Sequence, residues 1–434
     1  MATLPPSKPS SGRGFSSWGH SWRRTFQSLG NTDFRWYWIG TLGSFGAIQV
    51  QMLARGWLVY DLTKSPLDLG IVSSAWAVPV ILFSLISGVV VDRVDRRNLL
   101  IVTQSLLALV TLVVAVLIAL GLIQVWHLVA NALLTGIFFS FNMPGRQALL
   151  PQLVGDDELM NAVALNSTGM NLMRIAAPAA AGPLIALTGV AGVWFIIVGF
   201  YALGAISLLF IRPQGVVSRP AASPIRDMAE GLNYMRGHAV LLGLMAMALV
   251  PILLGMPYQS FLPIFAVDVL NVGSAGLGML MGMVGVGALV GTLVIASLGD
   301  IRRKGLLLFV LAIIFGIALA LFALSRSFYL SLFFLLFVGV GNTGYLAVNN
   351  ALILTTADKQ MHGRVMSIYM LSWGLMPLSA LPAGWLAEVL VKSPHPSGWL
   401  GDMWGIPLVV ALGGVLLALA ALAFAFLRPE LRRL

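Results

Sequence analysis

The chain has 434 residues and a formal net charge of +10; 59% of its residues are hydrophobic and only 10% are charged. A soluble domain carries about 25% charged residues, so this composition predicts a membrane protein and excludes an ordinary soluble one. The sequence contains no Cys, which excludes disulfides, thiolate metal sites and cysteine nucleophiles.

The chain begins with a segment that is too polar to cross a membrane. Residues 1–30 are rich in Ser, Pro, Gly and Arg and contain no apolar run. A signal peptide needs an apolar stretch of about 7–15 residues and is therefore excluded. We expect a disordered cytoplasmic tail over 1–30, which turns into a short surface helix near Trp22–Phe34.

Twelve apolar runs follow, and a helix needs about 20 apolar residues to cross a membrane. The first six runs lie at 35–62, 66–91, 99–122, 125–147, 158–187 and 189–211. After a polar linker, the other six lie at 239–268, 274–299, 304–324, 327–357, 364–391 and 402–428. The sequence therefore predicts an all-α membrane protein of twelve transmembrane helices in two pseudo-symmetric six-helix bundles, at 31–211 and 239–428, with a cytoplasmic tail at 429–434.

The linker, residues 212–238, is expected to contain a helix of its own. Ser223-Pro224 combines a preferred N-cap residue with Pro at the first helical position. The apolar residues of the next turns share one face, and the charged residues lie elsewhere. This pattern predicts an amphipathic helix on the inner membrane surface.

The basic residues predict the orientation. With the N terminus inside, only three of the 26 basic residues lie outside, namely Lys64, Arg326 and Lys392. Arg55 and Arg174 fall within helices, and the other 21, including Arg146, are cytoplasmic. Cytoplasmic loops gather Lys and Arg, so both termini are expected in the cytoplasm of a plasma-membrane protein. The same rule explains the net charge without nucleic-acid binding.

The two sets of runs carry an internal repeat. Gly70 precedes Asp92 by 22 residues, and Gly278 precedes Asp300 by the same interval, at an offset of 208 residues. Just upstream, Tyr60-Asp61-Leu62 corresponds to Val267-Asp268-Val269 at an offset of 207. Two like halves in a membrane predict modules that move against each other, and not a passive anchor.

A charged turn, Gly88-x-x-x-Asp92-Arg93-x-x-Arg96-Arg97, ends the second run. Gly88 leaves room for a close helix contact. Asp92 can accept hydrogen bonds from the free N–H groups at the start of a neighbouring helix. The arginines can pair with loop carboxylates or lipid phosphates. An ordinary positively charged loop is the alternative.

This turn resembles the signature loop between helices 2 and 3 of the major facilitator superfamily, with Asp95 where the family usually has Gly. Three further stretches resemble its enterobactin-exporter-like branch of multidrug and siderophore exporters, namely Pro144-x-Arg146-Gln147-Ala148-Leu149-Leu150-Pro151-Gln152-Leu153-Val154, Asp227-x-x-Glu230-Gly231-x-x-Tyr234 and Gly363-Arg364-Val365-Met366-Ser367. The resemblance, over residues 30–428, implies alternating access, proton-coupled export and a cytoplasmic latch that is closed in the outward-facing state. The implied gating residues are Gly88, Asp92, Arg93, Arg96, Arg97, Asp300, Arg303 and Arg364.

The fifth run carries a second resemblance. Ala177-Pro178-x-x-Ala181-Gly182 resembles the Gly-Pro-x-x-Gly-Gly motif of drug/proton antiporters, with alanines in place of two glycines. Its small residues let a partner helix approach closely, and Pro178 permits a bend. Tight packing alone is the alternative. In the eighth run, Gly278-x-x-x-Gly282 and Gly287-x-x-x-Gly291 predict sliding contact between the bundles.

Polar side chains inside the spans are the candidate substrate contacts. Arg174 lies near the middle of its span, where a charge costs about 2.5–3.5 kcal/mol. It either contacts an anion or a substrate, or it holds carbonyls and amides of the protein. The other candidates either contact substrate or hold helices together; they are Gln49, Gln51, Asn142, Asn166, Asn349 and, as part of an aromatic wall, Trp373.

The resemblance to drug/proton antiporters implies a carboxylate within a span, and the sequence places none at mid-depth. The candidates are therefore Asp33 and Glu388, near the two ends of their spans. Coupling by an unusual site, or none, is the alternative. The five His residues lie in loops or at helix ends, no His/Asp/Glu cluster has ligand spacing, and no phosphate-binding motif is present. We expect no metal, no cofactor and no enzymatic activity.

The sequence thus predicts a monomeric secondary transporter that exports a small amphiphilic organic compound, with protons and membrane lipids as its other partners. Spans rich in Trp, Met and Phe suit a bulky, partly apolar substrate. A nutrient importer or uniporter of the same fold is one alternative. A non-transporting membrane enzyme or scaffold is another, which the paired charged turns disfavour.

Overall fold

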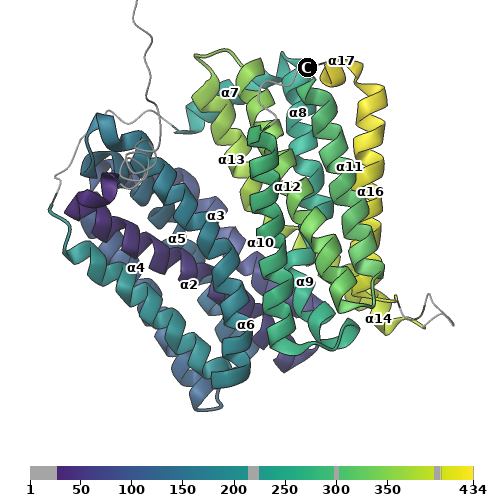
Figure 1. Ribbon diagram of the computed structural model, residues 1–434, viewed down its shortest axis with the longest axis horizontal. Coiled ribbons are helices and arrows are strands. Elements are labelled where there is room, and N and C mark those ends of the chain that lie inside the picture. Colours follow the sequence, from purple (N-terminus) through teal and green to yellow (C-terminus); the bar gives the residue numbers. More distant parts are fainter. Residues whose placement is uncertain (1–26, 214–223, 298–302, 395–400, 402, 434) are drawn as a thin grey trace, which may run out of the picture.

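The computed structural model describes residues 27–213, 224–297, 303–394, 401 and 403–433, and all regular structure in this part of the chain is helical. We call residues 27–213 the N-terminal half and residues 239–433 the C-terminal half. Figure 1 shows them as two groups of long helices.

The N-terminal half contains η1 (Gln27–Gly30), α2 (Thr32–Thr63), α3 (Pro66–Arg93), α4 (Arg96–Ala119), α5 (Val125–Leu153) and α6 (Asp156–Leu209). Polar N-cap side chains begin three of them, because Asn31, Ser65 and Asp95 accept hydrogen bonds from the first free N–H groups of α2, α3 and α4. α6 contains two predicted spans, and its helical geometry breaks between them at Gly189, whose φ of 71° favours glycine.

The C-terminal half contains α8 (Ala239–Val250), η2 (Pro251–Gly255), α9 (Tyr258–Ile264), η3 (Phe265–Val269), α10 (Gly273–Ser297), α11 (Lys304–Leu324), α12 (Phe328–Thr356), α13 (His362–Leu378), α14 (Ala380–Lys392), α16 (Ile406–Leu427) and α17 (Pro429–Arg433). The predicted run at 239–268 is therefore not one regular α-helix. It contains π-helical turns at η2 and η3. Pro251, which begins η2, and Pro263, two residues before η3, each lack a backbone donor. α7 (Pro224–Arg236) forms where the linker helix is predicted.

Ten helical segments of the described residues are long and apolar enough to cross a membrane. The 54 residues of α6 count once among the ten, although Gly189 divides them. α2 is not among the ten, since Arg35, Gln49, Gln51 and Arg55 lower the mean hydropathy of its 32 residues. These lengths and compositions are those of a multi-pass membrane protein.

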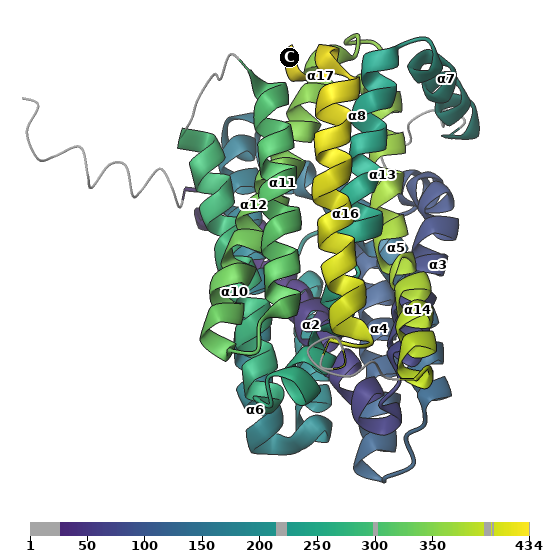
Figure 2. The same ribbon diagram turned by 90° about the vertical axis from the view of Figure 1, so that its right-hand side faces the viewer.

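The two halves touch at one end and diverge at the other. α3 packs against α13 and α14, and α6 packs against α10. In Figure 1 the ribbons of the halves lie apart at the end that carries α7 and α17 and come together at the end that carries α9 and α14, and Figure 2 shows α14 beside the N-terminal half. We call these the α7 end and the contact end.

Parts of both predicted tails are folded onto the helices. Residues 27–30 form η1, and the buried Ser28 donates a hydrogen bond to Asn161 Oδ1 of α6. Phe34 is fully buried within α2 and does not belong to a surface helix. In α17, Leu431 is buried. The expected tails at 1–30 and 429–434 therefore overlap the fold at these positions, and residues 1–26 and 434 lie outside the described residues.

Candidate functional site

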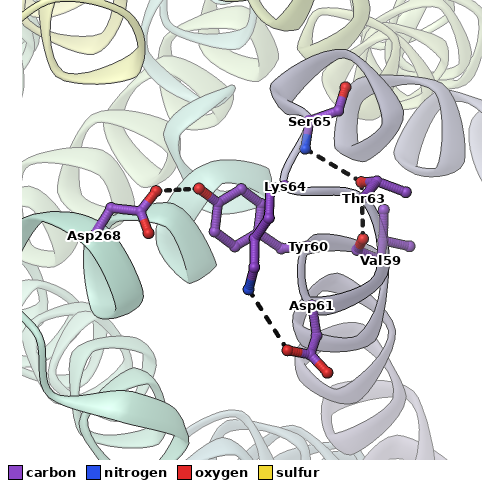
Figure 3. Close-up of polar contacts among 7 residues, drawn as sticks. All are labelled: Val59, Tyr60, Asp61, Thr63, Lys64, Ser65 and Asp268. Atoms are coloured by element: carbon purple, nitrogen blue, oxygen red, sulfur yellow. Dashed lines mark hydrogen bonds and ion pairs between the residues drawn. The ribbon is translucent and has the colours of Figure 1, made fainter.

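A polar pair joins the two halves at the contact end. Tyr60, near the end of α2, donates its hydroxyl hydrogen to Asp268 Oδ2 in η3 (Figure 3). Within the N-terminal half, Lys64 pairs with Asp61 at 3.5 Å and places its amine 5.1 Å from the centre of the Tyr60 ring. Hydrogen bonds to a carboxylate are stronger than neutral ones, so this pair holds the halves together in the present conformation.

A second polar contact crosses between the halves beside the first turn of α3. Ser65 Oγ donates to Glu388 Oε2 of α14 at 3.1 Å, and Lys392 Nζ binds the other carboxylate oxygen at 3.1 Å. The Glu388 side chain is only 18% exposed. The candidate proton-coupling carboxylate Glu388 therefore lies in the interface between the halves.

Glycines let the backbones of the halves touch at this end. A Cβ on Gly70 of α3 would stand 2.7 Å from the carbonyl oxygen of Ala380, and a Cβ on Gly384 of α14 would stand 2.6 Å from that of Pro66. Such small residues allow membrane helices to approach closely. Closure of the contact end thus depends on positions that have no room for a side chain.

The Pro178–Gly182 motif forms a third close contact. A Cβ on Gly182 would stand 2.9 Å from the Cα of Gly278 in α10, and a Cβ on Gly278 would stand 2.7 Å from the carbonyl oxygen of Pro178. The predicted approach of a partner helix is confirmed, and the partner belongs to the other half.

The second glycine pair of α10 does not face the other half. A Cβ on Gly287 would abut the backbone of Leu336 in α12, and a Cβ on Gly291 would abut that of Val340. The prediction that this pair slides against the N-terminal half is therefore wrong. Gly278 and Gly282 lie on the face of α10 toward α6, whereas Gly287 and Gly291 lie on the face toward α12. The two pairs are on different faces because the five residues from Gly282 to Gly287 do not make up a whole number of helical turns.

The contact between the halves reaches only to the middle of the helices. Among the glycines, the contact ends at two positions. A Cβ on Gly374 would stand 2.5 Å from the Ile81 side chain, and a Cβ on Gly285 would stand 3.2 Å from the carbonyl oxygen of Arg174. Nearer the α7 end, a Cβ on Gly88 would meet no heavy atom within 4 Å. In this conformation Gly88 therefore has no close helix contact.

The charged turn binds its own half. Arg96 lies 3.8 Å from Asp92, whose side chain is 43% exposed, and Arg97 donates to the last two carbonyl oxygens of α6 at 2.9 Å each. Asp95, the departure from the family pattern, caps α4. Arg93 is exposed. The arginines thus fix the turn to α5 and α6, while the Asp92 carboxylate stays accessible.

The other implied gating residues lie in the C-terminal half. Arg364, in the first turn of α13, binds Glu230 of α7 at 2.8 Å. The Tyr234 hydroxyl of α7 accepts a hydrogen bond at 3.1 Å from the backbone N–H of Asp358, in the turn between α12 and α13. Arg364 therefore anchors the linker helix in this conformation. Arg303 is exposed at the start of α11, and Asp300 lies outside the described residues.

Two arginines lie within spans and have no partner among the described residues. Arg174 is exposed, although it shares a face of α6 with the buried Ala181 and Ile185. Arg55 is half-buried in α2, and its Nη1 is a buried atom without a hydrogen-bond partner. These are the two cationic groups of the spans that remain available to a bound molecule.

A third arginine is fully satisfied by neutral groups. Arg146 is 3% exposed and lies within α5, near the end of the predicted run at 125–147. Its guanidinium donates to Asn142 Oδ1 at 3.0 Å and to the hydroxyls of Thr41 and Ser44 at 2.7 Å each. For Asn142, of the two roles left open, this bonding favours holding helices together.

Gln51 is held in the same way. It is 4% exposed, donates to Asn131 Oδ1 at 3.3 Å and accepts from the Tyr201 hydroxyl at 2.9 Å. Both partners belong to the N-terminal half. Its bonds also favour a packing role in this conformation.

The remaining amides have unused hydrogen-bonding capacity. Gln49 is half-buried in α2. Asn166 Oδ1 and both polar side-chain atoms of the fully buried Asn349 have no hydrogen-bond partner. An unpaired buried polar group costs about 1–3 kcal/mol, so a ligand or water at these atoms would be stabilising. The side chain of Trp373 on α13 lies outside the described part.

The second proton-coupling candidate is far from the first. Asp33 lies in the first turn of α2, at the other end of this helix from Tyr60, and accepts a hydrogen bond from the backbone N–H of Arg212 at 3.3 Å. A carboxylate in the first turn also interacts favourably with the helix dipole. Asp33 and Glu388 therefore cannot share one proton site.

Sequence reasoning missed three of the residues that join the halves, namely Tyr60, Ser65 and Asp268. The internal repeat, which relates Tyr60-Asp61-Leu62 to Val267-Asp268-Val269, is the signal that could have identified Tyr60 and Asp268. Ser65 lies outside this repeat. Pseudo-symmetric positions of two modules meet at the axis between them, so polar residues there are natural contact partners.

The family model described as "Transmembrane secretion effector" matches residues 23–394. The staphyloferrin A transporter of Staphylococcus aureus is 25% identical over 353 residues, covering 81% of this chain and 86% of that protein. The multidrug efflux pump Tap of Mycolicibacterium fortuitum is 27% identical over 350 residues, covering 78% and 85%. The enterobactin exporter EntS of Shigella boydii is 23% identical over 349 residues, covering 76% and 77%.

Among solved structures, a mutant form of the nucleoside transporter NupG matches with a TM-score of 0.70. The match covers 90% of this chain and 99% of that one, at 13% sequence identity. At this identity the likeness concerns the fold alone.

Proposed function

Because the chain belongs to the transmembrane secretion effector family of the major facilitator superfamily, we propose that it exports a small amphiphilic organic compound, a drug or a siderophore, across the plasma membrane. Its relatives are transporters and not enzymes. The presence of an enterobactin exporter among them confirms the resemblance to that branch.

The one-sided contact between the halves is the observation that carries the proposal. The halves touch from the contact end to mid-depth and diverge toward the α7 end. In an alternating-access cycle, substrate enters from the cytoplasm at the α7 end, the halves tilt, and the contact end opens to the outside. The Tyr60–Asp268 and Ser65–Glu388 bonds break in that step.

The proposal assigns twelve spans and a cytoplasmic α7 end. The two parts of α6 on either side of Gly189, together with α2, raise the ten apolar segments to twelve. The basic residues of the charged turn and of α7 then lie in the cytoplasm, with both termini. The protein acts as a monomer among membrane lipids.

The residues divide into three roles in this proposal. Asp92 and its arginines, with Arg303 and Arg364, close the α7 end in the outward-facing state. Tyr60 and Asp268 close the contact end in the inward-facing state. The substrate lies between these two ends. Its proposed contacts are Arg174, Gln49, Asn166 and Asn349, which have unused polar capacity, together with Trp373 of the predicted aromatic wall.

Inside-out vesicles test the proposed export. Vesicles that contain the protein are expected to take up an amphiphilic dye or a siderophore when the lumen is acid, and empty vesicles are not. Movement in the opposite direction only would indicate an importer, and uptake that ignores the imposed pH gradient would indicate a uniporter. Absence of movement for a full drug and siderophore panel contradicts transport of either class.

The double substitution Asp33→Asn/Glu388→Gln is expected to abolish the dependence of uptake on the pH gradient. The reason is that these carboxylates lie at opposite ends of the helices, Asp33 in the first turn of α2 and Glu388 in the interface at the contact end. The measurement compares initial uptake rates with and without an acid lumen. Asp61→Asn is the matched control, because Asp61 is 60% exposed and pairs only within its own half. If uptake by the double variant still depends on the pH gradient, proton coupling uses other residues.

A further inference from the structure

We propose that the exported compound is an organic anion, bound between Arg174 of α6 and Arg55 of α2. This inference rests on the proposed function and narrows its substrate class to amphiphiles that carry carboxylates or comparable anionic groups. Two guanidinium groups inside the spans, without an acidic partner, carry it.

Arg174 lies where the contact between the halves ends. Its carbonyl oxygen is the innermost contact of α6 with α10, through Gly285. Ala181 and Ile185, on the same face of α6 but nearer the contact end, are buried, whereas Arg174 is exposed. We attribute this difference to the divergence of the halves toward the α7 end (Figure 1). The guanidinium is thus accessible from the side at which a cytoplasmic compound arrives.

Arg55 lies deeper toward the contact end. The part of α6 before Gly189 runs beside α2 in the same direction, and Met173 lies against Gly46, so Arg174 is level with the residue after Gly46. Arg55 is eight residues farther along α2, which is about 12 Å at 1.5 Å per residue. Its neighbour Gly56 lies against α9 of the other half. Arg55 itself lies one helical turn after Gln51 on the same face of α2, near Tyr201 of the N-terminal half. The two charges therefore lie at successive depths of the N-terminal half.

Arg146 shows how this chain satisfies an arginine that needs no ligand. Its guanidinium has three neutral oxygen partners within 3.0 Å. For Arg55 and Arg174 the described residues provide no hydrogen bond or ion pair, and Arg55 Nη1 is buried. None of the 16 acidic residues of the sequence lies in the middle of a span. The missing counter-charge must come from another molecule.

An anionic group of a bound molecule would supply this counter-charge. A guanidinium binds a carboxylate through two parallel charge-assisted hydrogen bonds, and a charge held in the membrane interior is costly without such a partner. Two guanidinium groups at successive depths match an elongated compound with more than one anionic group. A cationic drug would meet two like charges, so the pair also selects against cations.

The test uses the purified full-length chain and two dyes that share a xanthene core, anionic carboxyfluorescein and cationic rhodamine 123. Fluorescence anisotropy gives the dissociation constant of each dye. Wild-type protein is expected to bind carboxyfluorescein at least tenfold more tightly. Arg174→Gln and Arg55→Gln each weaken that binding about tenfold or more, and Arg174→Lys, which keeps the charge, retains the preference.

Arg174→Glu is the decisive variant, because it should invert the preference toward rhodamine 123. The matched control is Arg326→Gln, which removes one positive charge from the exposed turn between α11 and α12; its dye preference stays that of the wild type. The inference is overturned if wild-type protein does not prefer carboxyfluorescein, or if the preference survives in Arg174→Glu. If Arg174→Glu fails to fold, Arg174→Gln and Arg174→Lys are compared instead. The inference is then overturned if both variants bind carboxyfluorescein equally tightly.

Uptake of the two dyes into inside-out vesicles separates this inference from the proposed function. Uptake of rhodamine 123 without carboxyfluorescein overturns the anion site and leaves export standing. Charge-dependent binding with no uptake of either dye or of any siderophore overturns export and leaves the anion site standing.

Discussion

Linking position 60 to position 268 is expected to reduce transport to background. In Tyr60→Cys/Asp268→Cys, a bifunctional thiol reagent as long as the two replaced side chains fixes the contact end closed across the halves. Alternating access requires that end to open, so the linked protein cannot release its substrate. The natural sequence has no Cys, and the reagent therefore meets two thiols only. Vesicle uptake is measured before linking, after linking and after reduction of the link, which restores the unlinked rate.

The matched control for this link is Asp61→Cys/Lys64→Cys. These neighbours form an exposed ion pair at 3.5 Å within the N-terminal half, beside the Tyr60–Asp268 bond (Figure 3). A link between them crosses no moving contact, so transport should continue. Undiminished uptake through the linked 60–268 pair would falsify opening at the contact end and remove alternating access from the proposed function.

The helices could be predicted because their causes are local. Ser65 followed by Pro66 starts α3 through a side-chain cap and a residue that lacks an N–H group. The break at Gly189, where a glycine adopts positive φ, falls at the start of the predicted run 189–211 and just after the run 158–187. Apolar length fixes the rest, because a lipid-exposed segment must satisfy its backbone hydrogen bonds internally.

The partners of the polar residues could not be predicted, because they are far apart in the sequence. The charge pattern counts Arg146 only as a cytoplasmic basic residue, yet its buried guanidinium donates a hydrogen bond to Thr41, which is 105 residues away in the sequence. Tyr60 and Asp268 are separated by 208 residues. Hydropathy records how deep a residue lies, but not which residue of another helix it faces. For this reason Arg174 could be identified from its depth alone, whereas the residues that close the contact end could not.

Gly182→Val is expected to reduce transport at least tenfold in a folded, inserted protein. Its Cβ would stand 2.9 Å from the Cα of Gly278, and its other near neighbours are also backbone atoms, which cannot rotate away. Overpacking of this kind costs about 1–3 kcal/mol. The cost applies only to the conformation in which α6 and α10 touch. A difference of that size changes the ratio of two conformations by about 5–150-fold, here toward the state that is open at the contact end.

Gly199→Val is the matched control for this substitution, because a Cβ at Gly199 in the same helix α6 would meet no heavy atom within 4 Å. Both changes replace a helical glycine by valine, so their difference in rate isolates the contact with α10.

Labelling of Asp268→Cys by an impermeant thiol reagent from outside identifies the cause. If Gly182→Val opens the contact end, slower transport is accompanied by faster labelling, since the cysteine leaves the interface more often. If transport is slower but labelling is unchanged, the loss of transport rate belongs to a step other than closure of the contact end. If the transport rate equals that of the wild type, the α6–α10 contact can be weakened without slowing the cycle.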